Sequence, residues 1–318
     1  MLKCRKLKLL IKENVQEELK KINDYFMRRN LDDEVISSHW KKYGGKTFIS
    51  FDKEFSRVDL KAEGFDDFKK INTLNVIKNI PIEFYLKKKL YPLLSKRLID
   101  AVENVVRVQG RVMSYNCVKQ ALCLNNVEKY GLDFDAKRVA IIGDGNGYLG
   151  MLLKTLYPNV KIIQINLAKV LMFDLIFTSL LSNLNQLRVV LNSKDYLETA
   201  DFNFIPAEEV STIHLSGIDF FFNIASMQEM DLRVINFYFE LIRSQNSKKT
   251  YFYCCNRVSK KLPDGTVASF DDYPWLETDK VVFDAVCDWY SEFPISRPPF
   301  VKEFDGKHKH RLIEVQSW

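Results

Sequence analysis

The sequence predicts an α/β fold, in which helices cover a mostly parallel sheet that follows a helical N-terminal extension. Two observations predict it. From about residue 139 onward, apolar runs of strand length alternate with helical patterns, as in doubly wound sheets. The first of these runs leads into closely spaced glycines and a helix, an arrangement typical of nucleotide-binding domains. We therefore expect a helical N-terminal domain over residues 1–112 and a sheet domain over residues 113–318.

The glycines define the first candidate site. Residues 139–142 form an unbroken apolar run of the kind found in strands that are buried on both faces. Glycines let the backbone turn sharply and approach a ligand, and the N–H groups of the helix that starts near Leu149 would face that ligand. The predicted cofactor loop consists of Gly143, Asp144, Gly145, Asn146 and Gly147.

The identity of the nucleotide is ambiguous at this point. Gly145, Gly147 and Gly150 satisfy the G-x-G-x-x-G spacing of dinucleotide-binding loops, which would make the protein an NAD-dependent oxidoreductase. The alternation of Gly143, Gly145 and Gly147 is also how S-adenosylmethionine-dependent methyltransferases of the Rossmann-like class begin. Roughly 130 residues precede the loop, which suits a helical extension before a methyltransferase domain.

The composition argues against some classes of protein, such as membrane-spanning proteins, but it does not favour a particular function. The 318 residues include 47 Lys and Arg against 41 Asp and Glu, a net charge of +6 that does not require a nucleic-acid partner. Six cysteines without C-x-x-C spacing predict reduced, buried thiols. The longest apolar segment, residues 170–181, contains Asp174 and is too short to cross a bilayer. With no export signal recognised, we expect a cytoplasmic protein.

The N-terminal part of the chain is predicted to be largely helical. Residues 15–26 carry apolar side chains at helical spacing. A second amphipathic stretch over residues 84–102 follows a break at Pro81 and is predicted to kink at Pro92. Residues 40–46, in which aromatic side chains adjoin a Gly-Gly pair, form either a turn between helices or a lid over the substrate.

Later strands are predicted at residues 160–165, 202–205, 217–223 and 251–255, with a final antiparallel strand at 309–315. Asn166 follows the second strand, 19 residues beyond Gly147, close to the spacing at which an acidic residue holds the ribose in related folds. An amide can also bind ribose hydroxyls, so Asn166 and the adjacent Leu167 are predicted to contact the cofactor.

Polar side chains follow the fourth and fifth predicted strands. Because the carboxyl ends of parallel strands meet at one edge of a sheet, these residues are expected to converge where a ligand binds. Ser226 could also cap a helix that starts at Met227. The candidates are Asn223, Ser226, Gln228, Glu229, Asn256 and Arg257.

Three segments resemble one protein family. Residues 222–230 (FNIASMQEM), 252–257 (FYCCNR) and 272–275 (DYPW) resemble, in this order, the bacterial sugar O-methyltransferases. The resemblance spans about residues 80–315 and implies a Rossmann-like class I methyltransferase fold with a seven-stranded, mostly parallel sheet and S-adenosylmethionine as the cofactor. Ile141 and Asn166 stand where the wider class commonly carries acids, so a degenerate, non-catalytic binding subunit remains an alternative.

The resemblance also implies a reaction: methylation of a sugar hydroxyl during tailoring of bacterial surface polysaccharides or glycoconjugates. The catalytic base is expected to be Glu229, with His214 second because imidazole titrates near neutrality and Asp272 third. Asn223 is assigned to the cofactor. The predicted substrate contacts are Ser226, Gln228, Asn256, Arg257, Tyr273 and Trp275.

No metal site is expected, since His308 and His310 resemble an exposed strand face. The acceptor sugar could be free, nucleotide-linked or lipid-linked. The sequence indicates neither a nucleic-acid partner nor a membrane span, and it leaves open whether the protein forms a homo-oligomer.

Overall fold

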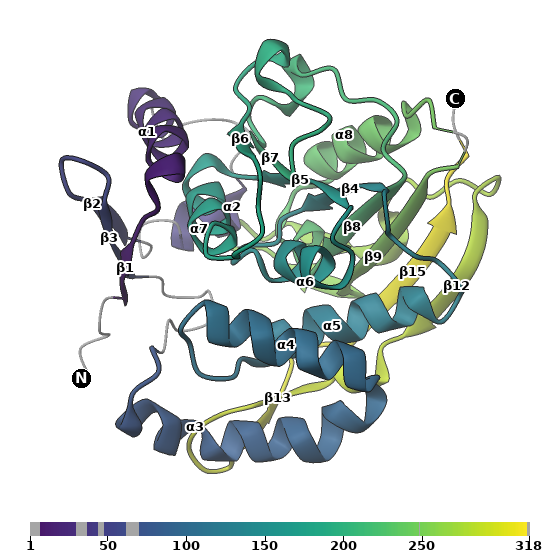
Figure 1. Ribbon diagram of the computed structural model, residues 1–318. Coiled ribbons are helices and arrows are strands. Elements are labelled where there is room, and N and C mark those ends of the chain that lie inside the picture. The colour runs from purple at the N-terminus through teal and green to yellow at the C-terminus, as the bar shows by residue number, and fades with distance from the viewer. Residues whose placement is uncertain (1–6, 30–36, 44–47, 62–69, 248, 317–318) are drawn as a thin grey trace.

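This computed structural model describes residues 7–29, 37–43, 48–61, 70–247 and 249–316 (Figure 1). Cys4 and the Gly-Gly pair at residues 44–45 lie outside the described residues. Of residues 40–46, which were interpreted as a turn or a lid, the structure describes only residues 40–43, at the end of a helix.

The centre of the fold is a sheet of eight strands within the described part of the chain. Its strands are β4 (Arg138–Ile142), β5 (Lys161–Asn166), β6 (Leu187–Val189), β7 (Phe202–Pro206), β8 (Phe220–Ile224), β9 (Tyr251–Arg257), β12 (Lys280–Val286) and β15 (His308–Glu314). They lie in the order β12-β15-β9-β8-β4-β5-β7-β6 (Figure 1). β15 runs antiparallel to both of its neighbours, and the pairs from β9 to β6 are parallel.

The predicted α/β fold with a mostly parallel sheet and a final antiparallel strand is thus confirmed. Two strands were not predicted. β6 has three residues, too few for a recognisable pattern. β12 is an edge strand whose residues are mostly exposed or partly buried, so it lacks the apolar run of a buried strand.

Helices cover both faces of the sheet (Figure 1). The helices of this part of the chain are α5 (Tyr115–Glu128), α6 (Tyr148–Leu156), α7 (Ala168–Thr178) and α8 (Leu232–Arg243). Apolar residues of α8, among them Ile235 and Phe239, pack with Phe252 of β9 in one core. The side chains of α5, α6 and α7 pack in a second core on the other face. Burial on both faces explains why the central strands are continuously apolar.

The N-terminal part, which was predicted to be largely helical, also contains three short strands. Its elements are β1 (Leu7–Leu10), α1 (Glu13–Arg28), α2 (Ser38–Tyr43), β2 (Phe48–Phe51), β3 (Arg57–Lys61), α3 (Thr73–Tyr85) and α4 (Lys96–Val108). The three strands pair antiparallel in the order β1-β3-β2. They are four or five residues long, so the helical patterns around them dominated the prediction. The division of the chain at residue 112 stays a prediction.

Helix boundaries also differ from the expectation around the prolines. Pro81 lies inside α3 instead of breaking it, and the chain continues through a π-helical turn at Leu86–Leu90 and a 3-10 turn at Tyr91–Leu93. The direction changes at Ser95, whose side chain accepts a hydrogen bond from the Leu98 backbone N–H and caps α4. The break therefore lies just after the turn that contains Pro92, close to the predicted kink, and not at Pro81.

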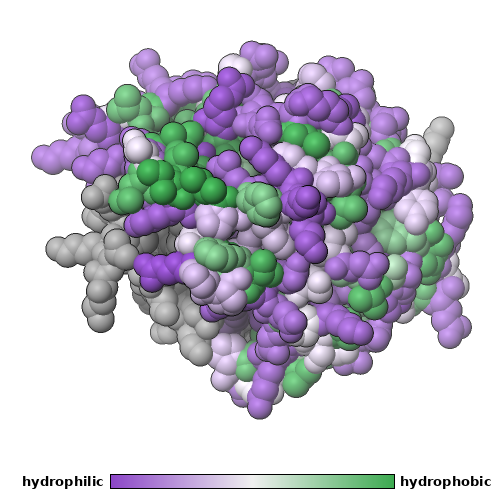
Figure 2. Space-filling model, turned by 90° about the horizontal axis from the view of Figure 1, so that it is seen from below, coloured by the Kyte–Doolittle hydropathy of each residue, from purple (hydrophilic) through white to green (hydrophobic). Residues whose placement is uncertain are grey.

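The face of the molecule seen in Figure 2 carries a patch of apolar side chains. Ile77, Ile80 and Phe84 of α3 are all more than half exposed. No helix in the described residues is both long enough and apolar enough to cross a membrane.

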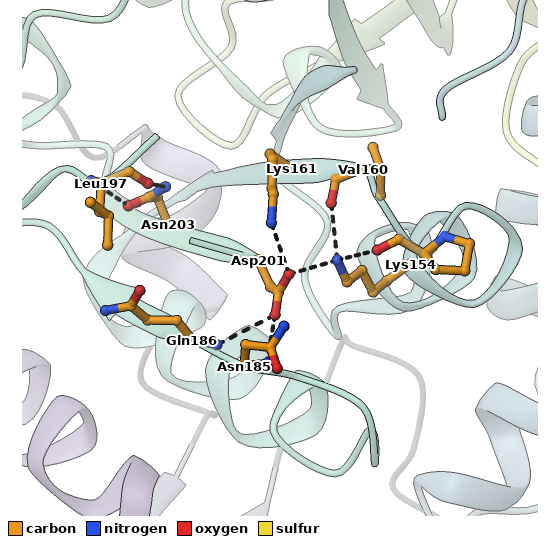
Figure 3. Close-up of polar contacts among 9 residues, drawn as sticks. Lys154, Val160, Lys161, Asn185, Gln186, Leu197, Asp201 and Asn203 are labelled. Atoms are coloured by element: carbon orange, nitrogen blue, oxygen red, sulfur yellow. Dashed lines mark hydrogen bonds and ion pairs between the residues drawn. The ribbon is translucent and has the colours of Figure 1, made fainter. Parts of the chain in front are cut away.

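Several charged groups stabilise the fold far from the carboxyl ends of the strands. Asp201 precedes β7 and accepts hydrogen bonds from Lys154 Nζ at 2.8 Å and Lys161 Nζ at 3.2 Å (Figure 3). The backbone N–H groups of Asn185 and Gln186 donate to its other oxygen. Asp201 therefore connects α6, β5 and the chain around β6.

Smaller hairpins follow β9. They are formed by β10 (Ser259–Lys261) with β11 (Val267–Ser269) and by β13 (Glu292–Pro294) with β14 (Val301–Glu303). A 3-10 turn at Met227–Glu229 follows β8.

Candidate functional site

A cavity of about 390 Å³ opens where the central parallel strands end. Its lining includes residues from the loops after β4, β5, β7 and β8, and others from α2, α5 and the chain around β10. This is the edge of an open α/β sheet at which ligands bind. The cavity has the size of a small-molecule site.

The glycine loop, predicted to bind the cofactor, forms one wall of this cavity. Gly143, Asp144, Gly145 and Asn146 line the cavity, whereas Gly147 lies just behind them. Gly143 has a φ of +80°, and an added Cβ would lie 2.1 Å from Ser226 Oγ. Only glycine fits at this position, because the loop passes so close to the chain that follows β8.

Asp144 has a definite structural role. Its carboxylate accepts hydrogen bonds from the backbone N–H groups of Leu149 and Gly150, at 3.0 and 2.8 Å, and from Gln164 Nε2 at 3.2 Å. Burial raises the pKa of Asp144, although these donors oppose the rise. The carboxyl group thus occupies the N-terminus of α6, the place where a dinucleotide fold binds pyrophosphate.

Asn166 and Leu167 also line the cavity. Asn166 Nδ2 donates to Asp174 Oδ2 at 2.9 Å, and the Gly147 N–H donates to the other oxygen of Asp174. Burial, reinforced by the nearby carboxyl of Asp144, raises the pKa of Asp174 well above its usual range. Asp174 therefore links the glycine loop to the end of β5, and it fixes the Asn166 amide at the cavity wall.

A network of buried amides holds the turn after β8. Asn223 Nδ2 donates to the Ile142 carbonyl at 2.9 Å, and Asn223 Oδ1 accepts from the Met227 N–H and from Asn256 Nδ2. Asn256 Oδ1 accepts from the Gln228 N–H at 3.0 Å. Asn223 and Asn256 are fully buried and do not line the cavity. They are positioning residues and not the predicted ligand contacts.

The residues that this network presents do line the cavity. They include Ser226, Gln228 and Glu229. Gln228 Oε1 accepts from the Arg257 N–H at 2.8 Å, which joins the turn to β9. Ala225, just before them, has a φ of +61°, a left-handed conformation that costs a non-glycine residue about 1 kcal/mol or more. Strained backbone of this kind is concentrated at functional sites.

Glu229 is the most chemically distinctive residue of the cavity. One of its carboxylate oxygens lies 2.8 Å from Lys260 Nζ and the other 3.3 Å from His39 Nε2. All three side chains are less than one-fifth exposed and line the cavity. A carboxylate, an imidazole and an ammonium group that share hydrogen bonds at a cavity wall can accept and pass on a proton.

Aromatic and polar side chains form the rest of the wall around Glu229. Trp40, Tyr290 and Phe304 supply flat apolar surfaces, and Lys119 and Arg257 supply positive charge. Two buried oxygens of the lining, Gln120 Oε1 and Asn146 Oδ1, have no hydrogen-bond partner among the described residues. Buried polar atoms are rarely left in this state, and a ligand would satisfy them.

Four further predicted site residues lie outside the cavity. His214 and Asp272 are exposed and line no part of it, so geometry gives neither of them access to a ligand bound there. Tyr273 is buried in the core beneath α8, and Trp275 packs beside it with its indole N–H donating to the Phe270 carbonyl. Neither ring stacks on the cavity, because the segment that carries them crosses the far face of the sheet.

The histidines of β15 also differ from the expectation. His308 and His310 are buried and not on an exposed face. The alternation of basic residues suggested exposure, but β15 lies between β9 and β12, and α5 covers it.

Sequence analysis missed several residues of the cavity. His39 comes from α2, and Lys119 and Gln120 come from α5. Trp40, also of α2, belongs to residues 40–46, for which a lid over the substrate was one of two interpretations. Nothing local indicated that His39, 190 residues before Glu229 in sequence, would reach that carboxylate.

No family model matches the sequence, and no curated protein matches it. Among solved structures, it resembles a SAM-dependent methyltransferase from Aquifex aeolicus, with 15% identity, a TM-score of 0.36, and coverage of 60% of this chain and 88% of that one. It also resembles an O-methyltransferase from Bacillus cereus in complex with SAH, with 12% identity, a TM-score of 0.40, and coverage of 74% and 97%. TrmK of M. capricolum, in complex with S-adenosyl-homocysteine, shows 14% identity, a TM-score of 0.35, and coverage of 60% and 68%.

Structural similarity this low gives no information about activity, so the fold is assigned from the order and direction of the strands. A dinucleotide fold has the parallel order 3-2-1-4-5-6. Here β15 is inserted antiparallel between β9 and β12, and the glycine loop follows the central strand β4. The sheet is thus the expected mostly parallel α/β sheet with one antiparallel strand inserted, and its described part has eight strands where seven were expected.

Proposed function

We propose that the protein is an S-adenosylmethionine-dependent O-methyltransferase that acts on a sugar hydroxyl. The observation that carries the proposal is the position of Glu229. Its carboxylate faces the same cavity as the glycine loop and contacts His39 and Lys260. A proton acceptor beside a cofactor loop is what methylation of a hydroxyl needs.

The cavity residues fit S-adenosylmethionine better than NAD. Gly143, Gly145 and Asn146 offer a close backbone approach, and Asn166 and Leu167 continue the same wall. The buried, unpartnered Asn146 Oδ1 offers an acceptor to a ligand. Asp144 already occupies the N–H groups at the start of α6, and a second anion would be repelled there. A pyrophosphate is therefore disfavoured, whereas a cofactor without phosphate is not.

When bound, S-adenosylmethionine supplies a methyl group on a positively charged sulfur, which is an electrophile for an acceptor oxygen. The residues of the chain would orient that oxygen and remove its proton. Glu229 takes the proton, and His39 and Lys260 stabilise the arrangement on either side of it. The rings of Trp40, Tyr290 and Phe304 in the lining would limit the access of water to the reacting groups.

The lining supports a sugar as the acceptor. Amide and charged groups such as Gln120, Lys119 and Arg257 can hydrogen-bond hydroxyls, and Trp40 and Tyr290 can cover the apolar face of a sugar ring. We also propose that the protein tailors bacterial surface polysaccharides or glycoconjugates. Its acceptor sugar would be free, nucleotide-linked or lipid-linked.

Ligand binding and methyl transfer test it separately. Thermal unfolding is measured with S-adenosylmethionine, S-adenosylhomocysteine and NAD, and we expect the first two alone to raise the Tm. Transfer of a radioactive methyl group is then followed to free sugars, nucleotide sugars, a phenol and RNA. Labelling of a sugar supports the proposal.

The other outcomes of this experiment distinguish the alternatives. A Tm shift with NAD alone would show an oxidoreductase. Labelling of the phenol or the RNA would keep the cofactor and reject the sugar. S-adenosylmethionine binding with no transfer to any acceptor in cell extracts would indicate a non-catalytic binding subunit.

A further inference from the structure

Three potential metal ligands meet beneath α5, on the face of the sheet opposite α8. The ligand atoms of Cys255, Cys287 and His310 all lie within 4.8 Å of one another. Cys255 is on β9, His310 is its direct partner on β15, and Cys287 follows β12. Strand register, and not sequence spacing, brings them together.

Cys123 of α5 supplies a fourth candidate ligand. Its side chain is a neighbour of Cys255, which in turn lies beside Cys287. The cluster of Cys123, Cys255, Cys287 and His310 thus draws on four elements of the fold. Three sulfurs and one imidazole nitrogen form a ligand set typical of closed zinc sites.

The cluster is closed to solvent, and its histidine is held in place. All four side chains are buried, so a bound ion would have no contact with bulk water. The His310 ring is held in place by Tyr253, whose hydroxyl oxygen lies 3.2 Å from Nδ1, and by the amide of Asn126 at 3.2 Å. Such contacts orient ligand side chains in metal sites.

We propose that Cys123, Cys255, Cys287 and His310 form a structural zinc site. Tetrahedral coordination with bonds of about 2.3 Å places sulfur ligands about 3.7 Å apart. The ligand atoms of Cys255, Cys287 and His310, which lie within 4.8 Å of one another, would therefore have to close by about 1 Å at most. Zinc would join α5 to the sheet and so fix Lys119 and Gln120 at the cavity. The site does not depend on the proposed methyl transfer.

Metal analysis of protein purified without a histidine tag and without chelator tests the proposal. We expect about one zinc per chain in the wild type, and less than a tenth of that in Cys255→Ser and in Cys287→Ser. Cys254→Ser is the matched control, because Cys254 is equally buried on the same strand but packs on the opposite face with α8. This variant should keep its zinc.

Reconstitution with cobalt gives a second readout on the wild type, in case the serine variants do not fold. Cobalt bound by thiolates should produce intense near-ultraviolet absorption that zinc abolishes. The proposal is overturned if the wild type holds no stoichiometric zinc and cobalt produces no thiolate absorption. It is equally overturned if both serine variants fold and retain zinc.

Discussion

At the scale of single residues, Glu229 is set apart by its two partners. Of the carboxylates proposed from the sequence, Asp272 is exposed outside the cavity, whereas Glu229 lines it and contacts His39 and Lys260. A base with a partner on each side keeps a fixed orientation, which matters because a small misplacement of a catalytic group costs rate.

Glu229→Gln should lower turnover by about 10²- to 10⁴-fold, the usual contribution of a general base. The amide keeps the size of the side chain but does not accept the proton. Binding of S-adenosylmethionine, measured by isothermal titration calorimetry, should change by less than about 3-fold, since Glu229 is assigned to the acceptor.

Glu240→Gln is the control, because Glu240 is exposed on α8, and its turnover should equal that of the wild type. His39→Gln removes only the imidazole partner of Glu229 and should lower turnover less than Glu229→Gln does. Full activity in Glu229→Gln would exclude Glu229 as the base.

The sequence could predict Glu229 but not its environment. A carboxylate shortly after an apolar strand is recognisable because strand ends form the site. The contact with His39 joins positions about 190 residues apart, and no local pattern contains that information. Asn223 and Asn256 were predicted to contact ligands because the sequence alone does not distinguish an amide in a buried network from an amide that binds a ligand.

At the scale of elements, the site depends on how closely the loop after β4 approaches the turn after β8. Gly143 contacts Ser226, and the Asn223 side chain hydrogen-bonds the Ile142 carbonyl next to it. The two segments form a single wall, so a change that separates them should affect the cofactor before it affects the fold.

Gly143→Ala should abolish measurable binding of S-adenosylhomocysteine. Its Cβ would overlap Ser226, and its φ of +80° strains any other residue. The matched control is Gly110→Ala, at a φ of +65° with no atom near the added Cβ. Both variants should lose about 1 kcal/mol of stability from backbone strain, but Gly110→Ala should bind normally. Equal binding in both variants would show that this approach of the loop is irrelevant to the cofactor.

Helices and strands with many buried residues were easier to predict from the sequence than short or edge elements. β4, β5 and β8 have apolar runs because both faces are covered, and α1 shows a clear helical period. β1 to β3, β6 and β12 are short or lie at edges, so their patterns are weak. Pro81 lies inside α3 without ending it, and the helical chain ends only after the 3-10 turn that contains Pro92, where Ser95 caps the start of α4.

At the scale of the whole molecule, buried ion pairs stabilise the fold at the edge of the sheet away from the cavity. Burial opposes ionisation of Asp201, but the hydrogen bonds from Lys154 and the Asn185 backbone outweigh it and lower the pKa of Asp201 below 3.8 (Figure 3). A carboxylate with a lowered pKa stabilises the folded state above its unfolded pKa, and this contribution is lost as the pH falls through the folded value.

Asp201→Asn should therefore cost about 3 kcal/mol at pH 7, because Lys154 stays buried without its anionic partner. The difference from the wild type should be constant from pH 7 to pH 5 and should shrink below about pH 3.8, as the wild-type carboxylate is protonated. Urea unfolding at each pH measures it.

Asp271→Asn provides the comparison, because the Asp271 side chain is mostly exposed, and its pair with Lys309 should be worth less than about 1 kcal/mol. A difference between Asp201→Asn and the wild type that persists undiminished at pH 3.5 would contradict the role of the ionised carboxylate.

Asp144 has a consequence for any attempt to redesign the protein. Enlarging the cavity or adding a ribose-binding acid at position 166 would not convert it to a nicotinamide cofactor, because the first turn of α6 already carries its own anion. Replacing Asp144 would free those N–H groups, yet it would also uncap the helix that orients the loop. Cofactor choice is thus tied to the stability of the fold, and directed evolution towards phosphate-bearing ligands would have to change both together.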